Sequence, residues 1–390
     1  MKKNIYLWAL YDFANSILSI TFLFYFSQWL VVDSGRPDWW FNVALIVSSL
    51  LFILSAPIAA RHIDRTGRKL PGLRVTSAVL FILYLMVACV TIFWPIHVVV
   101  AVVVYTFALY FYLMSFLYYT PMLNDLSTHE NRSHVSGIGG AANYLGQVTG
   151  LLATLPFVTG AIYFFGAHGR AQALLPAVIL SALFALPTLI MYREEGGHQR
   201  PVSEVQRTVV STMKSVFANR NLLLLLVGYF FFSDALLTFS NNFPIYLQKV
   251  HEVGDSIKAY LTLSILFFSG IGAFIFGKLA DKKGKKRVLS WLLIAWCVFF
   301  PLLAFAPSFS FVVVLCVVAG IMFGPVWAVS RAMVSDYAPR EIEASSFGLY
   351  VIAERFATFI GPIVWGASAL NSYSRSVTGR NVYEHFKFSL

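Results

Sequence analysis

The sequence predicts an all-α membrane protein made of two bundles of transmembrane helices, and three observations support this prediction. Hydrophobic residues make up 58% of the 390 residues and charged residues only 12%, against roughly 45–50% and about 25% in ordinary soluble proteins. The apolar residues form long runs, separated by short segments that hold most of the Lys and Arg. The two halves of the chain also share local sequence features. This composition excludes a cytosolic enzyme, a disordered scaffold and a disulfide-stapled secreted domain.

A helix that spans a bilayer needs about 20 mostly apolar residues. In chain order, the runs that meet this requirement are 5–32, 42–60, 72–93, 97–120, 134–164, 171–191, 221–247, 257–276, 288–306, 309–333 and 344–369. The first run follows Lys2 and Lys3 as in a signal peptide. It is too long for one and contains Asp12 and Asn15, so we expect it to be retained as a span.

Positive charges occupy alternate segments between these runs. The N-terminus and the loops after the second, fourth, sixth, eighth and tenth runs together hold 20 Lys and Arg residues. The intervening loops hold only Arg36, Arg170, Lys249 and Lys258. Cytoplasmic loops of membrane proteins carry an excess of Lys and Arg, so we expect a cytoplasmic N-terminus. The net charge of +11 is explained by these loops and does not predict a nucleic-acid partner.

The polar stretch 192–220 divides the runs into two groups. We expect residues 1–191 to form a six-helix bundle, 192–220 a cytoplasmic linker, 221–370 a five-helix bundle and 371–390 a polar tail. Within the linker, the segment 203–218 is either an amphipathic helix on the cytoplasmic surface or plain linker, and the pattern favours neither.

The two groups of runs contain an internal repeat. Asp64 follows the second run and Asp281 follows the eighth, 217 positions later. A second set of matches is 211 positions apart: Asp125 with Asp336, Gly137 with Gly348, and Gly150 with Gly361. Both sets belong to the side that we expect to be cytoplasmic. The repeat unit therefore has an even number of spans, as in two six-helix halves related by an axis along the membrane normal.

These residues resemble motifs of the major facilitator superfamily. Its loop signature G-x-L-A-D-x-x-G-[KR]-[KR] is complete at 277–286, whereas the first copy has Ala60 where the first Gly is expected. Other motifs resemble the vacuole-effluxer-like branch, which contains autophagy-related amino-acid permeases and bacterial relatives: Tyr11-Asp12-Phe13-Ala14-Asn15-Ser16, Asn124-Asp125-Leu126, Tyr144-Leu145-Gly146, Ser233-Asp234, Ser330-Arg331, Phe347-Gly348-Leu349-Tyr350 and Gly361-Pro362. The resemblance implies a major-facilitator-like fold, secondary transport by alternating access, efflux, and a location in the bacterial inner (plasma) membrane.

The superfamily has twelve spans, and residues 371–390 contain no apolar run long enough to be the twelfth. We therefore expect six plus five transmembrane helices. The resemblance places the twelfth helix outside the central cavity, so this departure does not exclude transport.

Charged and amide side chains inside the runs are candidate functional residues, because a charge near the bilayer centre costs about 2.5–3.5 kcal/mol. We assign six residues to a substrate and proton pathway: Asp12, Asn15, Asn143, Asp234, Glu354 and Arg355. In this interpretation Arg355 holds an anionic group of the solute, and an acid whose pKa is raised by burial carries the coupling proton. The alternative is that these residues are static pairs that hold the bundle together.

The resemblance also implies a cytoplasmic gate, in which the repeated loops pin the two halves together. We assign five residues to it: Asp64, Arg68, Arg132, Asp281 and Arg331. A carboxylate can bind the positive N-terminal end of a helix, so we expect Asp64 to approach Ser345 and Asp281 to approach Ser133.

The arginines of the gate have separate expected roles. Arg68 and Arg132 are expected to pair with Asp64 within the first half. Arg331 lies near the inner end of its run, where it could extend to the membrane interface. The alternative for the loops is an ordinary capped surface turn.

No motif indicates catalysis: the chain has no P-loop, no G-x-S-x-G and no HExxH, and its three Cys residues lack metal-ligand spacing. We therefore expect no enzyme activity, cofactor or metal. The leading hypothesis is a monomeric, proton-coupled secondary transporter that exports a small polar or amphoteric solute such as an amino acid. The alternatives are a truncated membrane protein that does not transport (a partner, a sensor or a decayed gene product) and multidrug efflux on the same fold.

Overall fold

The computed structural model describes residues 2–37, 39–164, 166, 169–194 and 209–356. In these ranges the helices are α1 (Lys2–Thr21), α2 (Trp39–Thr66), α3 (Leu70–Phe93), α4 (Val98–Tyr119), α5 (Met122–Leu126), α6 (Arg132–Val158), α7 (Leu174–Met191), α8 (Val209–Ala218), α9 (Arg220–His251), α10 (Asp255–Lys283), α11 (Lys285–Ala304) and α12 (Phe309–Tyr337). Two π-helical turns, η1 (Phe22–Phe26) and η2 (Trp29–Asp33), extend α1. The 3-10 turns η3 (Arg170–Ala173) and η5 (Arg340–Ile342) precede α7 and a last helix at 343–356.

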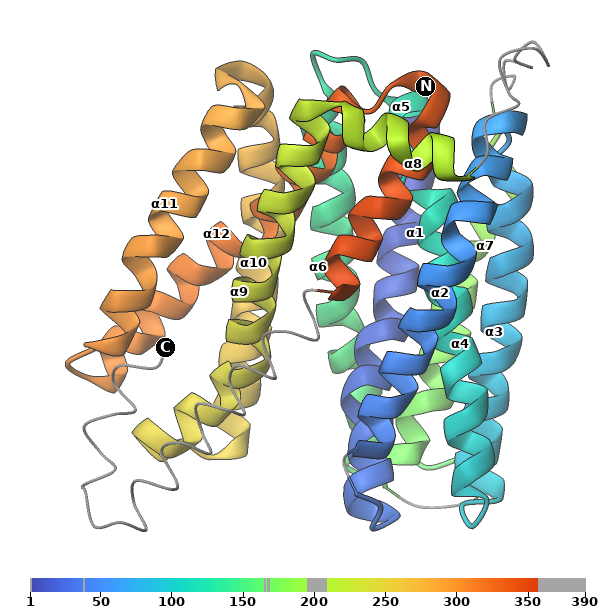
Figure 1. Ribbon diagram of the computed structural model, residues 1–390. Coiled ribbons are helices and arrows are strands. Elements are labelled where there is room, and N and C mark those ends of the chain that lie inside the picture. The colour runs from blue at the N-terminus through green and yellow to red at the C-terminus, as the bar shows by residue number, and fades with distance from the viewer. Residues whose placement is uncertain (1, 38, 165, 167–168, 195–208, 357–390) are drawn as a thin grey trace, which may run out of the picture.

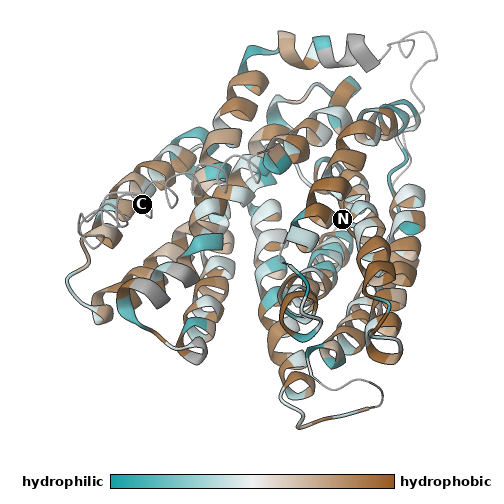
Figure 2. Cartoon of the chain, turned by 60° about the horizontal axis from the view of Figure 1, so that its bottom comes forward, coloured by the Kyte–Doolittle hydropathy of each residue, from teal (hydrophilic) through white to brown (hydrophobic). Residues whose placement is uncertain are grey.

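Within the described residues, nine helical segments are long and apolar enough to cross a membrane. Many of their large apolar side chains are exposed, for example Leu54, Ile58 and Ile190, each at 66% or more. Figure 2 shows that apolar residues dominate the helices along their length. An apolar surface of this extent is unstable in water, and a bilayer covers it. The protein is therefore a multi-pass integral membrane protein.

The first ten expected runs correspond to these nine segments and to α6. α6 ends at Val158, although we expected its run to continue to residue 164. It is not one of the nine apolar segments, because it is rich in Gly, Ser and amide residues. The run at 344–369 is helical as far as it is described, to residue 356. The expected tail at 371–390, and with it the six-plus-five division, lies outside the described residues.

The helices form two halves that lie side by side (Figure 1). The first half contains α1 to α7, and the second contains α9 to α12 and the helix at 343–356. α6 packs against α1 in its own half and against α10 and α12 in the other. Helix α8 forms within the expected linker, buries Val216 and contacts α2 and α9.

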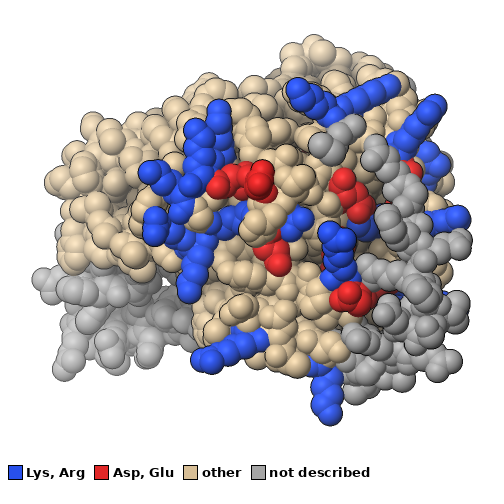
Figure 3. All heavy atoms as spheres, turned by 90° about the horizontal axis from the view of Figure 1, so that it is seen from above, with Lys and Arg blue, Asp and Glu red and all other residues tan. Residues whose placement is uncertain are grey.

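One end of the molecule, at the top of Figure 1, carries the start of α1 and the loops 67–69, 120–131 and 338–342. The junction of α10 and α11 lies there too. Figure 3 looks onto this end and shows many Lys and Arg side chains, with Asp and Glu among them. We call it the basic end.

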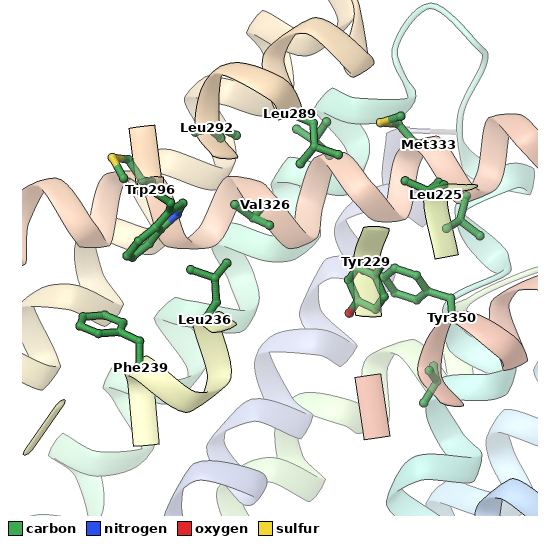
Figure 4. Packing of buried hydrophobic residues seen from close by; sticks show 14 of the residues in the cluster. Leu225, Tyr229, Leu236, Phe239, Leu289, Leu292, Trp296, Val326, Met333 and Tyr350 are labelled. Carbon is green, nitrogen blue, oxygen red and sulfur yellow. The ribbon is translucent and has the colours of Figure 1, made fainter. Parts of the chain in front are cut away.

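A large apolar core joins the two halves. It combines α9, α11, α12 and the last helix, and it includes Ala60 of α2 and Leu117 of α4. Figure 4 shows part of this core, with Tyr229 of α9 beside Tyr350 of the last helix. Two further apolar cores lie within the first half.

The backbones of α6 and α10 touch where glycines face each other. A Cβ atom added at Gly137 would lie 2.5 Å from the carbonyl oxygen of Ala273, and one added at Gly277 would lie 2.6 Å from that of Ser133. In lipid, helices associate through such close packing, because burial of apolar surface gives no driving force there. This crossing brings the N-terminus of α6 against the end of α10.

Candidate functional site

Two aspartates at the basic end bind helix N-termini across the two halves. Asp64 of α2 accepts hydrogen bonds from the backbone N–H of Ala344, at 2.7 Å, and of Ser345, at 3.1 Å. It also accepts one from the Ser345 hydroxyl, at 2.6 Å. The first amides of a helix have no partner within the helix and carry its positive dipole end, so a carboxylate is a favourable acceptor. The contact that we expected between Asp64 and Ser345 is present.

In the corresponding contact, the acceptor belongs to the second half and the donors belong to the first half. Asp281 of α10 accepts hydrogen bonds from the backbone N–H of Ser133, at 2.9 Å, and of His134, at 2.7 Å, at the start of α6. The two aspartates are 217 positions apart, and the two amide pairs that they bind are 211 positions apart. The internal repeat therefore places one such contact on each side of the interface. We call these two contacts the aspartate latches.

Beside the first aspartate latch, a buried ammonium lies between two carboxylates. Lys69 Nζ is 2.8 Å from Asp125 and 3.3 Å from Glu343 of the other half, and it also donates to the carbonyl oxygen of Pro121. Burial opposes the charged form of Lys69, but the carboxylates of Glu343 and Asp125 outweigh it and raise its pKa. Burial also raises the pKa of Glu343, although Lys69 opposes this.

Beside the second latch, a buried carboxylate lies between cations, the reverse of the arrangement around Lys69. Asp336 at the end of α12 contacts Arg132 and Lys285, both at 2.6 Å, and His129 at 3.0 Å. We had expected Arg132 to pair with Asp64, but it pairs with Asp336 in the other half. Arg68 is exposed, and the oxygens of Asp64 are occupied by the amides of the last helix. The expected pairing within the first half was wrong because the helix N-terminus already binds Asp64.

Further from the basic end, Asp12 of α1 faces Arg331 of α12. Asp12 is fully buried and the Arg331 side chain is 13% exposed, with 3.6 Å between their charged atoms. Asn143 of α6 donates to Asp12 at 2.8 Å, and Gln147 donates to Asn143 at 2.7 Å. The expectation that Arg331 extends to the interface was wrong, because a buried carboxylate lies closer. At 3.6 Å this ion pair has no hydrogen bond, so both groups keep hydrogen-bonding capacity.

A second group of charges lies on the last helix. Arg355 contacts Glu354 at 2.8 Å, and the hydroxyl of Tyr229 on α9 donates to Glu354. The rings of Tyr229 and Tyr350 are stacked with centroids 4.0 Å apart (Figure 4). The hydroxyl of Tyr350 is 3.1 Å from that of Ser330, next to Arg331 in α12.

Two tyrosines of the first half link these groups. Tyr144 on α6 is close enough to interact electrostatically with Asp12, Arg331 and Glu354. Tyr112 on α4 interacts in the same way with Asp12, Glu354 and Arg355. We call this set the central cluster; its members are Asp12, Tyr112, Asn143, Tyr144, Gln147, Tyr229, Arg331, Tyr350, Glu354 and Arg355.

Two expected pathway residues are not members of the central cluster. Asn15 is buried one turn beyond Asp12 on α1 and donates to Ser115 at 3.4 Å. Asp234 is half-buried on α9, five residues beyond Tyr229 and therefore about 7 Å further from the basic end. Its assignment to the pathway stays a prediction, as do the roles of the other candidates.

Several site residues escaped the sequence reasoning. Lys69 and Glu343 were missed because a charge at a helix end is indistinguishable in sequence from a solvated one. Tyr229 was missed, and Tyr350 was noted only as part of a family motif, because tyrosines in apolar runs are typical packing residues. The signal for Asp336 was available in its match to Asp125 in the repeat. Among the described residues, no group of three or more His, Cys, Asp or Glu side chains could hold a metal ion.

Comparison with known proteins identifies the family and the fold. The family described as "Vacuole effluxer Atg22 like" matches residues 121–376. An uncharacterised major-facilitator-type transporter of Bacillus subtilis, YxiO, is 24% identical over 93% of this chain and 87% of its own. The proton-coupled antiporter flippase LtaA of Staphylococcus saprophyticus is 25% identical over 58% of this chain and 56% of its own.

Solved structures share the fold. The crystal structure of the human organic anion transporter MFSD10 superposes with a TM-score of 0.72 at 14% sequence identity, covering 93% of this chain and 92% of that one. At this low sequence identity, the match is evidence for the fold alone. Because the family match covers more than half of the sequence, the chain belongs to the vacuole effluxer Atg22-like family of major facilitator transporters.

Proposed function

We propose that this secondary transporter exports a small amphoteric solute, such as an amino acid, in exchange for protons by alternating access. The observation that carries the proposal is the central cluster, in which both halves contribute buried charges directly behind the latches of the basic end. Residues shared by two halves can be exposed to one side and then the other when the halves rock about them.

The charges of the central cluster suit a solute that carries both signs. Arg331 and Arg355 offer guanidinium groups, which recognise a carboxylate through paired hydrogen bonds. Asp12 and Glu354 offer carboxylates for an ammonium group. When Asp12 takes up a proton, its attraction for Arg331 is lost, and the arginine is released to bind the solute. This supports exchange of the proton and the solute at one site.

The positive charge of the basic end supports its placement on the cytoplasmic side of a bacterial inner membrane, as the loop charges predict. In that orientation the latches close the molecule toward the cytoplasm. The chain works as a monomer in this proposal, since one copy supplies all the members of the central cluster.

The test is uptake into proteoliposomes with an imposed pH gradient, using zwitterionic amino acids, organic anions and lipophilic cations in parallel. We expect an amphoteric solute to accumulate. Arg331→Gln should reduce its uptake at least tenfold, and Asp12→Asn and Asp234→Asn should abolish the response to the gradient. Lys278→Gln, an exposed charge of the basic end outside the cluster, is the control.

Two outcomes would overturn the proposal. Accumulation of lipophilic cations alone would identify multidrug efflux. Absence of transport for every solute class, by protein that is folded and correctly inserted, would support a non-transporting membrane protein.

A further inference from the structure

A second feature of the basic end lies outside the latches and the central cluster. It is an open groove of about 910 Å³ between the α10–α11 junction, the end of α12 and the loop before α6. His129 and Glu130 of the first half line one side, and residues of the second half line the rest. The groove therefore exists as a single surface only while the two halves are together at this end.

More cations than carboxylates line the groove, and some of these cations have no carboxylate partner in it. Asp281 is engaged with the amides of α6, and Asp336 with Arg132, Lys285 and His129. Three further cations, Lys283, Lys286 and Arg287, line the groove, are exposed and form no ion pair with a described carboxylate. Glu130 is the one remaining lining carboxylate in the described chain. The surplus of cations makes an anion the complementary ligand.

The wall below these cations is apolar and faces the lipid. On α11, Arg287 is followed one turn later by Trp291, and Ser290 by Ile294, and all four line the groove. Trp291 is 47% exposed and Ile294 is 62% exposed. At about 1.5 Å per residue they lie about 9 and 13 Å along the helix from its first residue, Lys285. Basic residues above a Trp and an aliphatic surface are typical of the boundary between lipid headgroups and acyl chains.

We propose that this groove binds an anionic phospholipid, whose phosphate contacts Lys286 and Arg287 while its acyl chain lies along Trp291 and Ile294. The ligand chemistry is a phosphate ester. The apolar wall favours a lipid over a soluble phosphate, because a free anion would leave this wall without a partner.

The test measures binding of phosphatidylglycerol and phosphatidylcholine to the full chain in a neutral detergent by native mass spectrometry. Lys286→Gln combined with Arg287→Gln removes two groove cations. Lys278→Gln combined with Lys282→Gln removes two exposed cations of α10 outside the groove and is the matched control. Each cation near an anionic surface contributes roughly a fivefold affinity factor, so we expect the groove variant to bind phosphatidylglycerol roughly 30-fold more weakly. The control should bind as the wild type does.

Equal weakening in both double variants would overturn the proposal, because it would show attraction to net charge alone. Equal binding of the two lipids by the wild type would also overturn it, and this comparison needs no variant to fold. Inorganic phosphate and glycerol phosphate distinguish the two sources of the anion. We expect neither to displace phosphatidylglycerol at equal concentration, and displacement would assign the groove to a soluble anion.

Discussion

Lys69 and Asp336 are the central charges of two corresponding contacts with opposite charge balance. Lys69 lies between two carboxylates, whereas Asp336 lies between the cations of Arg132 and Lys285. Each central side chain is only 7% exposed. Removing either would leave two like charges facing each other, and all of these except the 46% exposed Asp125 are largely withdrawn from water, which is costly. We therefore expect substitution of the central residue of each contact to destabilise the protein more than substitution of an exposed charge at the same end.

Asp336→Asn tests this expectation. It leaves the Arg132 and Lys285 cations without their shared carboxylate, and loss of one partner from a buried ion pair costs about 3–5 kcal/mol. We expect a clear fall in the thermal unfolding midpoint of the purified protein. Glu130→Gln, an exposed carboxylate at the same end, is the control. Unfolding of the two variants at the same temperature would contradict the central role of Asp336.

At the level of residues, the repeat predicted the acceptors of the aspartate latches but not the partners of the arginines. Asp64 and Asp281 were identified because the same residue recurs at a fixed spacing. The partner of Arg132 depends on the rotation of α12, and the partner of Arg331 depends on how far the two halves approach. Both are properties of the packed structure, because a guanidinium on a long side chain can reach several neighbours.

At the level of elements, α6 is the helix on which the two halves meet. Its glycines allow the backbone of α10 to approach, and this approach places the N-terminus of α6 within reach of Asp281. The glycines of α6 and the Asp281 latch therefore belong to one contact between α6 and α10. A side chain added on this face of α6 would separate the helices and lengthen the hydrogen bonds of the latch.

Gly137→Ala is the corresponding prediction. Its Cβ would lie 2.5 Å from the Ala273 carbonyl oxygen, so the two backbones must separate. We expect a lower unfolding midpoint. Gly228→Ala on α9 is the matched control, since nothing lies within 4 Å of its added Cβ. Alanine is the better helix former by about 1 kcal/mol, so this control should be neutral or stabilising. Similar destabilisation by both substitutions would argue against the close crossing.

The sequence predicted the helices better than their ends. Long apolar runs identify spans because the bilayer requires about 20 such residues. The ends depend on tertiary contacts: α2 and α10 continue beyond their expected runs to Thr66 and Lys283, where their aspartates bind the other half. The linker helix α8 begins at Val209, and its pattern alone did not distinguish a helix from a linker.

At the scale of the whole molecule, the described polar contacts between the halves gather toward the basic end, from the latches to the pair of Asp12 and Arg331. Opening this end requires both latches to break. Hydrogen bonds to a charged group each contribute about 1.5–3 kcal/mol. Loss of one latch should therefore shift the equilibrium between closed and open forms by tenfold or more.

Asp64→Asn tests this shift. Spin labels at His62 and Lys282, which are exposed on opposite halves, report the distance across the basic end in a cysteine-free background. We expect a second, longer distance to appear. Asp33→Asn removes a carboxylate that pairs with Arg170 within the first half and is the control. If both variants give the same distance distribution as the parent, the latch does not hold the basic end closed.

The two reciprocal latches also make the interface self-complementary. The first half carries an acceptor, Asp64, and also the donors at Ser133 and His134. It therefore contains both kinds of group, the carboxylate and the helix N-terminus, that form a latch. Such an interface is the isologous kind that joins identical subunits in a two-fold dimer. A fragment that ends at residue 194 would thus present matching surfaces to another copy of itself, and the covalent link to the second half is what directs each half to its proper companion.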